Sequence, residues 1–291
     1  MQLNNFNARE RLGKREISFD MLAGIVGQVD RGFAVLTGSW VDGFPNLDSD
    51  IDILVVSASK LAGPVFNFSD GDSFVYSASI KGVEVNIEVY TPDAVERVQK
   101  YMESNVKVFA GQAPATELTF FDAYSDLRFI HRIATGVPII GEDRWRETSA
   151  AFGADFLRFY ICGLRTKEHF ALREDAISDF SEGAGLSALV QARNASVQLV
   201  HGAMALYGCT HAGDRWLAHY LARSVLPLDD EHRQRLIRLL NFQYSLADQP
   251  GMQLWLDDCN AVVGQIILPH HPDLARLFVA ISGSFPVRMA M

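Results

Sequence analysis

The sequence predicts an α+β protein, with a small mixed β-sheet domain and flanking helices followed by an all-α helical bundle. Runs rich in β-branched residues that alternate with polar ones are confined to the first hundred residues. From about residue 120 onward, apolar residues recur at helical spacing instead. Such segregation of strands from helices is typical of α+β folds. We therefore expect a first domain over residues 1–115 and a second over residues 116–291.

Composition and charge limit the class of protein. With 291 residues, 48% of them hydrophobic and 21% charged, the chain can fill two modest cores. A formal net charge of −9 argues against nonspecific binding to nucleic acid or to anionic membranes. The polar N-terminal stretch lacks an apolar signal core, and no apolar run reaches the ~20 residues that a membrane span needs. We expect a cytoplasmic protein without a membrane partner.

The three cysteines, Cys162, Cys209 and Cys259, lie far apart in the sequence and are odd in number. Neither their count nor their spacing suits a disulfide framework or a metal site. We predict reduced thiols.

The first elements follow from capping and periodicity. Residues 1–16 are polar and are expected to form an arm or a short helix. Ser18 is the expected N-cap of a helix, because its hydroxyl can accept a hydrogen bond from the first turn. Apolar residues of that helix recur at helical spacing, at Phe19, Leu22, Ile25 and Val26. The helix is expected to end at Arg31-Gly32, and residues 33–37 form the first predicted strand.

The remaining predicted strands precede residue 91. A second strand is expected over residues 51–57, and residues 58–71, which contain Gly63-Pro64, are predicted as a loop. Residues 74–79 and 83–90 flank a short glycine-containing turn and predict a β-hairpin. Phe66 and Phe68 in the loop are expected to cover the sheet.

The rest of the chain is predicted as helices. Pro92, near the first turn, begins a helix that ends near residue 110. A helix with an apolar stripe that includes Leu127 and Ile130 is stopped by Gly136-Val137-Pro138, and residues 139–143 form a break. Further helices are expected over residues 144–174, 182–207, 212–225, 229–247, 250–267 and 272–282.

The strongest chemical signal is a pair of acids at the start of the second strand. Strand residues alternate faces, so Asp50 and Asp52 point the same way while Ile51 points into the core. Two neighbouring carboxylates repel each other unless a cation lies between them. The preceding Gly38-Ser39 turn can bring backbone N–H groups close to a phosphate, because glycine has no Cβ. The pattern predicts a Mg²⁺ site beside a phosphate site.

This arrangement resembles the nucleotidyltransferase superfamily of the DNA polymerase beta type. An apolar strand ends in Gly38-Ser39, ten residues intervene, and Asp50-Ile51-Asp52 opens a second apolar strand. The alternative is an ordinary strand that begins with solvated acids after a glycine-rich turn. Acidic residues are a poor start for a strand without a cation, so the resemblance is favoured.

The resemblance implies an enzyme that transfers a nucleoside monophosphate, AMP from ATP, to a hydroxyl group and releases pyrophosphate. Gly38 and Ser39 would hold the phosphates of ATP or another NTP, and Asp50 and Asp52 would bind two Mg²⁺ ions. A third carboxylate usually comes from a later strand. Glu88 is the first choice, as metal ligand or catalytic base, and Glu84 the second. Asn86 stands where some members of the superfamily carry an acid.

Three hypotheses for the function follow, of which two differ in the acceptor and the third lacks catalysis. The acidic composition favours a small, cationic, hydroxylated acceptor such as an aminoglycoside-like compound, which the helical domain would bind, over nucleic acid. A protein or tRNA acceptor, as in toxin–antitoxin pairs, is the second hypothesis. The third is a catalytically inactive relative that binds a nucleotide or a partner. This hypothesis rests on Asn86, which stands where an acid would be needed for catalysis. A monomer and a homodimer are both compatible with the sequence.

Cations are needed near a triphosphate, because the charge on the transferring phosphoryl group must be neutralised. Four residues on predicted helices could supply them: Arg128, Arg132, Arg165 and Lys167. For each one, exposure to solvent is the favoured interpretation. The helical histidines His201, His211 and His219 are expected to be core or surface residues, and His270-His271 the start of a helix rather than a metal site.

Overall fold

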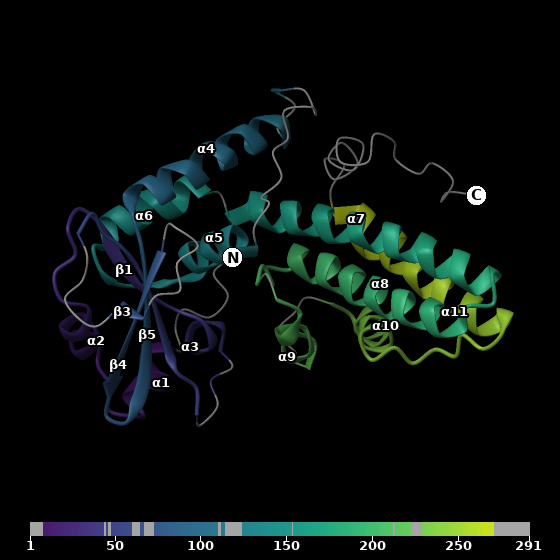
Figure 1. Cartoon of the computed structure of the whole chain (residues 1–291), viewed down its shortest axis with the longest axis horizontal. Helices are drawn as coiled ribbons and strands as arrows, with labels where there is room; N and C mark the ends of the chain where they lie inside the picture. The colour runs from purple at the N-terminus through teal and green to yellow at the C-terminus, as the bar shows by residue number, and fades with distance from the viewer. Residues whose placement is uncertain are drawn as a thin grey trace. The chain divides into compact units, whose positions relative to one another are not determined.

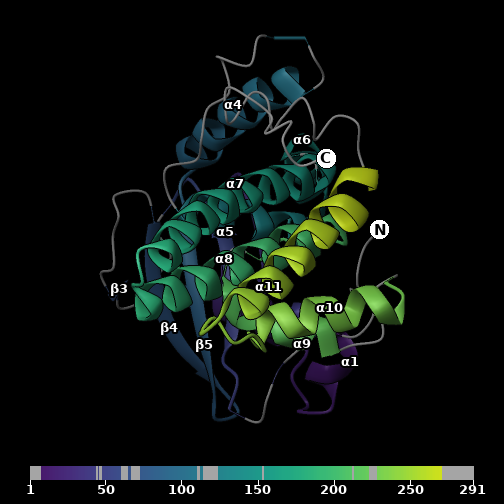
Figure 2. The same cartoon turned by 90° about the vertical axis from the view of Figure 1, so that its right-hand side faces the viewer.

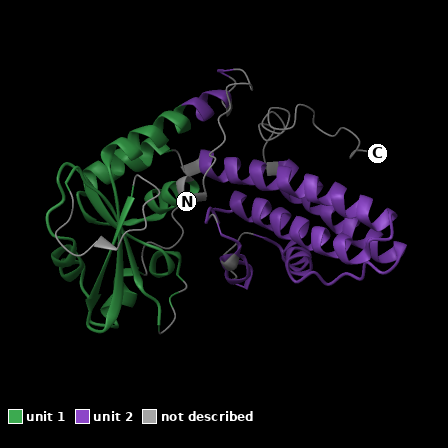
Figure 3. Ribbon diagram, viewed as in Figure 1, with its two compact units in different colours: residues 1–103, 121–154 green, residues 104–120, 155–291 purple. Residues whose placement is uncertain are grey.

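The computed structural model describes residues 8–43, 45, 48–59, 65–66, 73–109, 112–113, 124–152, 154–211, 213–222 and 228–270. It divides into two compact units, residues 1–103 with 121–154 and residues 104–120 with 155–291 (Figure 3). The first unit contains the sheet and the second is helical, so the chain has the predicted α+β class. The division differs from the expected boundary at residue 115, because residues 121–154 pack with the sheet.

The first unit is built on a mixed six-stranded sheet, with strand order β3-β4-β5-β2-β1-β6 (Figure 1). Strands β2 and β5 run parallel, and every other neighbouring pair is antiparallel. The bounds are Phe33–Thr37 for β1, Ile51–Val56 for β2, Val65–Phe66 for β3, Ser73–Ile80 for β4, Val83–Tyr90 for β5 and Val137–Ile140 for β6.

Helices accompany the sheet in the first unit (Figure 1). Their bounds are Ala8–Gly13 for α1, Phe19–Val26 for α2, Ser39–Asp42 for α3, Pro92–Phe109 for α4, Tyr124–Thr135 for α5 and Glu142–Phe152 for α6. The hydroxyl of Ser18 accepts a hydrogen bond from the Met21 N–H at 3.2 Å, which confirms the predicted cap of α2. The last residues of α4 belong to the second unit.

The two faces of the sheet carry different side chains. One face packs with α1 and α2 in an apolar core that includes Leu12, Leu22 and Ile53. The opposite face carries Tyr90, whose ring lies 4.4 Å from that of Phe129 on α5, measured between centroids. Because strand residues alternate, this second face also receives the polar residues of β2 and β5.

Two segments predicted without strands contain them. The predicted break at residues 139–143 overlaps β6, which pairs with β1 although it contains Pro138. Proline is tolerated there because β6 lies at the edge of the sheet, where one side of the strand needs no partner. In the predicted loop over residues 58–71, β3 pairs with β4. The side chains of Phe66 and Phe68 lie outside the described residues.

The second unit consists of helices (Figure 2). Their bounds are Ala154–Ser181 for α7, Gly185–Leu206 for α8, Leu217–Ala222 for α9, Asp230–Leu240 for α10 and Gln249–Ala261 for α11. A 3-10 turn over Asp214–Trp216 precedes α9, and a π-helix over Val262–Ile267 continues α11. The helix expected over residues 144–174 corresponds to α6 and part of α7. The one expected over residues 272–282 lies outside the described residues.

Small residues of α8 allow close packing in the second unit. The indole N–H of the fully buried Trp255 donates to the Ser196 hydroxyl at 2.8 Å. The Nδ1 atom of His169 on α7 lies 2.9 Å from the Ala195 carbonyl oxygen, and burial lowers the pKa of His169 to about 4. His169 is therefore a neutral core histidine at pH 7. His201 is also buried, and its ring bonds to Asp214 and to the His211 carbonyl.

Two further sequence predictions concern cysteines and membranes. Cys162, Cys209 and Cys259 are buried and unbridged, as predicted. None of the helices within the described ranges has the length and apolar character that a membrane span requires.

A buried carboxylate connects α10 to α11. Asp258 on α11 accepts hydrogen bonds from Arg235 and Arg238 of α10 at 3.0–3.2 Å, and from the Tyr244 hydroxyl at 2.6 Å. Burial disfavours the charged form, but the hydrogen bonds from Arg238 and Tyr244 outweigh it and lower the pKa of Asp258. The ionised side chain therefore stabilises the folded state.

We expect Asp258→Asn to lower the free energy of unfolding at pH 7 by about 2 kcal/mol, the scale for hydrogen bonds to a charged group. Since the pKa is lowered on folding, this contribution is full above the ordinary value of about 3.9 and is lost as pH falls through the folded value. Urea unfolding at pH 7, 5 and 3 measures the difference. The exposed neighbour Asp257, changed to Asn, is the control. A difference that did not shrink at low pH would contradict the account.

Candidate functional site

The ends of β1 and β2 bring the glycine-serine turn next to the acid pair. The antiparallel register places Thr37 opposite Asp52, and the Thr37 hydroxyl donates to the Asp52 carbonyl at 3.3 Å. The indole N–H of the buried Trp40 donates to the Asp50 carbonyl at 2.8 Å. These bonds hold the backbone that carries both acids against the turn formed by Gly38 and the buried Ser39.

Position 38 requires glycine because the carboxylate of Asp52 lies where a Cβ atom would be. Its φ angle is +71°, and a Cβ atom at this residue would lie 2.2 Å from Oδ2 of Asp52. Only glycine combines this backbone conformation with such a close approach. The Asp52 carboxylate therefore lies directly against the backbone of the turn.

The residue beside Asp52 on the next strand is Asn86. Strands β2 and β5 run parallel, with Asp52 opposite Asn86 and Leu54 opposite Glu88. The Ser77 hydroxyl on β4 donates to Oδ1 of Asn86 at 3.3 Å. The amide nitrogen of Asn86 in turn donates to Oδ2 of Asp50 at 2.6 Å. The amide thus presents an N–H donor to the acid pair.

Glu88 lies two residues farther along β5 and is buried, with 9% of its surface exposed. Three groups donate to its carboxylate. The Tyr90 hydroxyl and the Arg128 guanidinium bond to Oε1 at 2.6 and 2.8 Å, and Arg132 bonds to Oε2. Both carboxylate oxygens of Glu88 therefore have cationic partners.

Arg132 connects the two acidic groups. Besides its bond to Glu88, its second terminal nitrogen lies 3.6 Å from Oδ1 of Asp52. Arg128 and Arg132 are one helical turn apart on α5, so both project toward the same face of the sheet. The predicted exposure to solvent was therefore wrong for Arg132, whose side chain is 14% exposed, whereas the side chain of Arg128 keeps 37% of its surface exposed. A buried acid such as Glu88 requires a cationic partner. The four-residue spacing of Arg128 and Arg132, beside the apolar stripe of α5, was the sequence signal that could have identified these partners.

The other predicted residues lie elsewhere. Glu84 is exposed, opposite Ser79 of β4, at the position that precedes the first β2–β5 pair. Arg165 belongs to the second unit, where it bonds to Glu168 and Gln198. Glu84 has no hydrogen bond to Asp50 or Asp52 within the part of the chain that the structure describes.

The electrostatic environment favours a cation at Asp52. Burial raises the pKa of Asp52, Arg132 opposes the rise, and the negative charges of Asp50 and Glu88 add to it. A carboxylate that is partly desolvated beside another acid is a typical feature of a cation or catalytic site. Burial, followed by the Glu88 charge, likewise raises the pKa of Tyr90, which keeps its hydroxyl protonated as a donor.

The donor set fits a single Mg²⁺ ion. Mg²⁺ is commonly bound through one or two carboxylates, with water and substrate phosphates in its other positions. Asp50 and Asp52 share one face and meet this requirement. Within the described ranges, no group of three or more histidine, cysteine or acidic residues is arranged to hold a metal ion.

A second buried pair joins α3 to α5. The Nε2 atom of His131 lies 3.6 Å from Oδ1 of Asp42, and both side chains are at most 5% exposed. Oδ2 of Asp42 has no hydrogen-bond partner within the described part of the chain. This contact connects the helix that follows the Gly38-Ser39 turn to the helix that carries Arg128 and Arg132.

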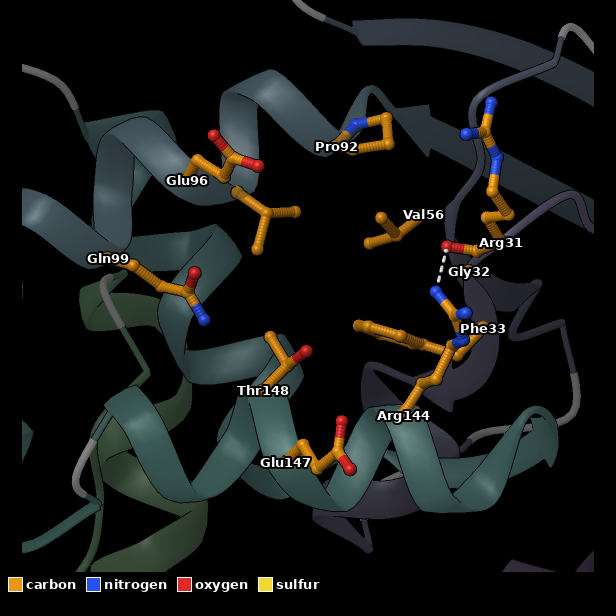
Figure 4. Close-up of a pocket in the computed structure, with 11 residues that line it drawn as sticks. Arg31, Gly32, Phe33, Val56, Pro92, Glu96, Gln99, Arg144, Glu147 and Thr148 are labelled. Carbon is orange, nitrogen blue, oxygen red and sulfur yellow. Dashed lines mark hydrogen bonds between the residues drawn. The ribbon is translucent and has the colours of Figure 1, made fainter.

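A pocket of about 160 Å³ lies at the other end of β1 and β2 (Figure 4). Phe33 and Val56 line it from the sheet, and Gln99 of α4 and Thr148 of α6 point toward its centre. Arg144 donates to the Arg31 carbonyl at 2.8 Å at its margin. None of the predicted site residues lines this pocket.

Comparisons with known proteins show a similarity among solved structures. No protein-family model matches the sequence, and no curated protein matches it. A solved structure of a nucleotidyltransferase-like protein from Exiguobacterium sibiricum is similar to this chain, with 13% sequence identity and a TM-score of 0.43. The alignment covers 94% of this chain and 79% of the other.

We expect Gly38→Ala to lower the free energy of unfolding by roughly 1–3 kcal/mol, because the new Cβ would displace the Asp52 carboxylate and strain the backbone. It should also weaken Mn²⁺ binding. Urea unfolding and Mn²⁺ titration measure both effects. Gly24→Ala, on an exposed face of α2 with no atom within 4 Å of the added Cβ, is the matched control and should be neutral or slightly stabilising. Equal behaviour of the two variants would contradict the assignment.

Proposed function

We propose that this protein is a nucleotidyltransferase that moves a nucleoside monophosphate, AMP from ATP, to a hydroxyl group of a small molecule and releases pyrophosphate. The observation that carries the proposal is the contact between Gly38 and Asp52. In this contact the carboxylate of Asp52, one of the two neighbouring acids, lies directly against the glycine-serine turn. A triphosphate complexed with Mg²⁺ needs these two features next to each other.

The proposed reaction is an in-line displacement at the α-phosphorus. The acceptor oxygen forms a bond to that phosphorus, and the bond from the phosphorus to the oxygen that bridges to the β-phosphate breaks. Pyrophosphate leaves, and the acceptor hydroxyl loses its proton. Mg²⁺ held by Asp50 and Asp52 would supply charge neutralisation for the phosphates and lower the pKa of the hydroxyl.

The chain's own residues would orient the nucleotide. The Gly38-Ser39 turn would bind the terminal phosphates through its backbone and the Ser39 hydroxyl. Arg128 and Arg132, which Glu88 and Tyr90 hold on the same face of the sheet, would add positive charge. The roles of Glu88 and Glu84 as third ligand or catalytic base stay predictions. Burial and the cationic partners favour Glu88 as a residue that positions the two arginines.

Charge favours a cationic acceptor. The protein has a formal net charge of −9, and its surface would attract an amine-bearing compound more than a nucleic acid. A hydroxylated amine of the aminoglycoside type combines the required hydroxyl with a positive charge. A nucleic-acid acceptor would instead need a cluster of basic residues to neutralise its backbone.

A second candidate function is a nucleotide-binding protein without turnover. The observation that favours it is the pair Asn86 and Glu88, of which the first is neutral and the second is bonded to two arginines. If turnover requires a free third carboxylate, this site would bind Mg²⁺ and nucleotide but would not release pyrophosphate.

The test is pyrophosphate release from each of the four NTPs in the presence of Mg²⁺ and a panel of hydroxylated amines. We expect release with ATP, and a loss of at least about 100-fold in Asp52→Asn, the scale for removing a group that acts in the transition state. Asp175→Asn, an exposed acid of α7, is the matched control and should retain full activity.

Each other outcome decides between the candidates. If calorimetry detects binding of ATP and Mg²⁺, but no combination of NTP and acceptor releases pyrophosphate, the nucleotide-binding protein is favoured over the transferase. Absence of ATP binding would contradict both. Release that is unchanged in Asp52→Asn would place the chemistry at another site.

A further inference from the structure

We infer that this site holds one divalent cation, bound by Asp50 and Asp52, and that Arg132 and Arg128 supply the positive charge that a second cation would otherwise provide. The inference rests on the proposed nucleotide site and extends it. It also departs from the expectation of two Mg²⁺ ions, which the experiment below decides.

The position next to Asp52 on the neighbouring strand offers a hydrogen-bond donor, not an oxygen ligand. A second cation would need an oxygen ligand from the neighbouring strand, and the register places Asn86 there. The amide oxygen of Asn86 already accepts a hydrogen bond from Ser77, which turns the amide nitrogen toward Asp50. An amide N–H group is a donor only and cannot bind a cation. The Asn86 side chain therefore completes a hydrogen bond to Asp50 rather than a second metal site.

Glu88 is also fully occupied by hydrogen-bond donors. Its carboxylate accepts hydrogen bonds from Tyr90, Arg128 and Arg132, and it is almost completely buried. To bind a cation, it would have to release at least one guanidinium into a partly buried environment, at a high cost in free energy. Glu88 is thus already neutralised by the helix that packs on this face.

The balance of charge also favours one cation. The three carboxylates of Asp50, Asp52 and Glu88 and the two guanidiniums leave one net negative charge. One divalent cation makes the group singly positive, which suits a polyanionic triphosphate. Two divalent cations would leave a net charge of +3 in a partly buried site that lacks the ligands to separate them. Arg132, which reaches both Asp52 and Glu88, lies where the extra charge would otherwise be needed.

The experiment counts cations directly. The protein is dialysed to equilibrium against Mn²⁺ and α,β-methylene ATP, and bound Mn²⁺ is measured per bound nucleotide. Electron paramagnetic resonance of the same samples detects coupling between paired Mn²⁺ ions, which in two-metal sites lie about 3.5–4 Å apart. We expect one Mn²⁺ per nucleotide and no coupling in the wild type. Asn86→Asp should raise the ratio to two and produce coupling.

Two variants separate a ligand from a positioning residue. Glu88→Gln should leave the Mn²⁺ ratio at one, as should the matched control Glu96→Gln, an exposed acid of α4. Arg132→Met should weaken nucleotide binding by about 10- to 100-fold, the scale for one charge-assisted hydrogen bond, without changing the ratio. Arg132→Lys, which keeps the charge, should restore part of the affinity.

The inference is overturned by two coupled Mn²⁺ ions in the wild type, by loss of a Mn²⁺ ion in Glu88→Gln, by a ratio that stays at one in Asn86→Asp, or by unchanged nucleotide affinity in Arg132→Met. In all four cases nucleotide still binds, so the proposed function survives. Absence of any nucleotide binding in the wild type would instead overturn both.

Discussion

Neutralising three carboxylates on one face of a sheet is the constraint on which the rest of the first unit depends. Asp50, directly before β2, Asp52 on β2 and Glu88 on the adjacent β5 project into a partly buried region, where unpaired charge is costly. Two guanidiniums of α5 offset most of that charge. The helix is in turn fixed by aromatic contact with the sheet and by the His131–Asp42 pair. Residues 121–154, which also supply the edge strand β6, belong with the sheet although they lie far from β1–β5 in the sequence.

The parallel pairing of β2 with β5 determines which polar groups meet. With Asp52 opposite Asn86, the amide lies beside the acid pair and Glu88 lies two residues farther along, within reach of α5. A shift of the β2–β5 register by two residues would place a glutamate of β5, instead of Asn86, opposite Asp52. Side-chain chemistry alone does not reveal such a shift. The site therefore combines an acid pair with a glutamate bound by two arginines, and the register of β2 and β5 determines that this glutamate does not lie beside Asp52.

Much of the first unit was predictable because its signals are local. The Ser18 cap and the strands over 33–37 and 83–90 each follow from a few neighbouring residues. What could not be predicted depends on distant pairing. Strand β6 becomes a strand only because β1 offers it an edge, and Arg128 and Arg132 look like surface residues until α5 is placed over Glu88.

The central claim is that Asp50 and Asp52 bind one cation beside the Gly38-Ser39 turn. Anomalous X-ray diffraction at the manganese edge, from crystals grown with Mn²⁺ and a nucleotide analogue that cannot react, tests it most directly. The account predicts one anomalous peak, in contact with both aspartates, and Glu88 still bonded to Arg128 and Arg132. Two peaks, with Glu88 turned away from the arginines toward one of them, would contradict it, as would a peak that touches neither aspartate.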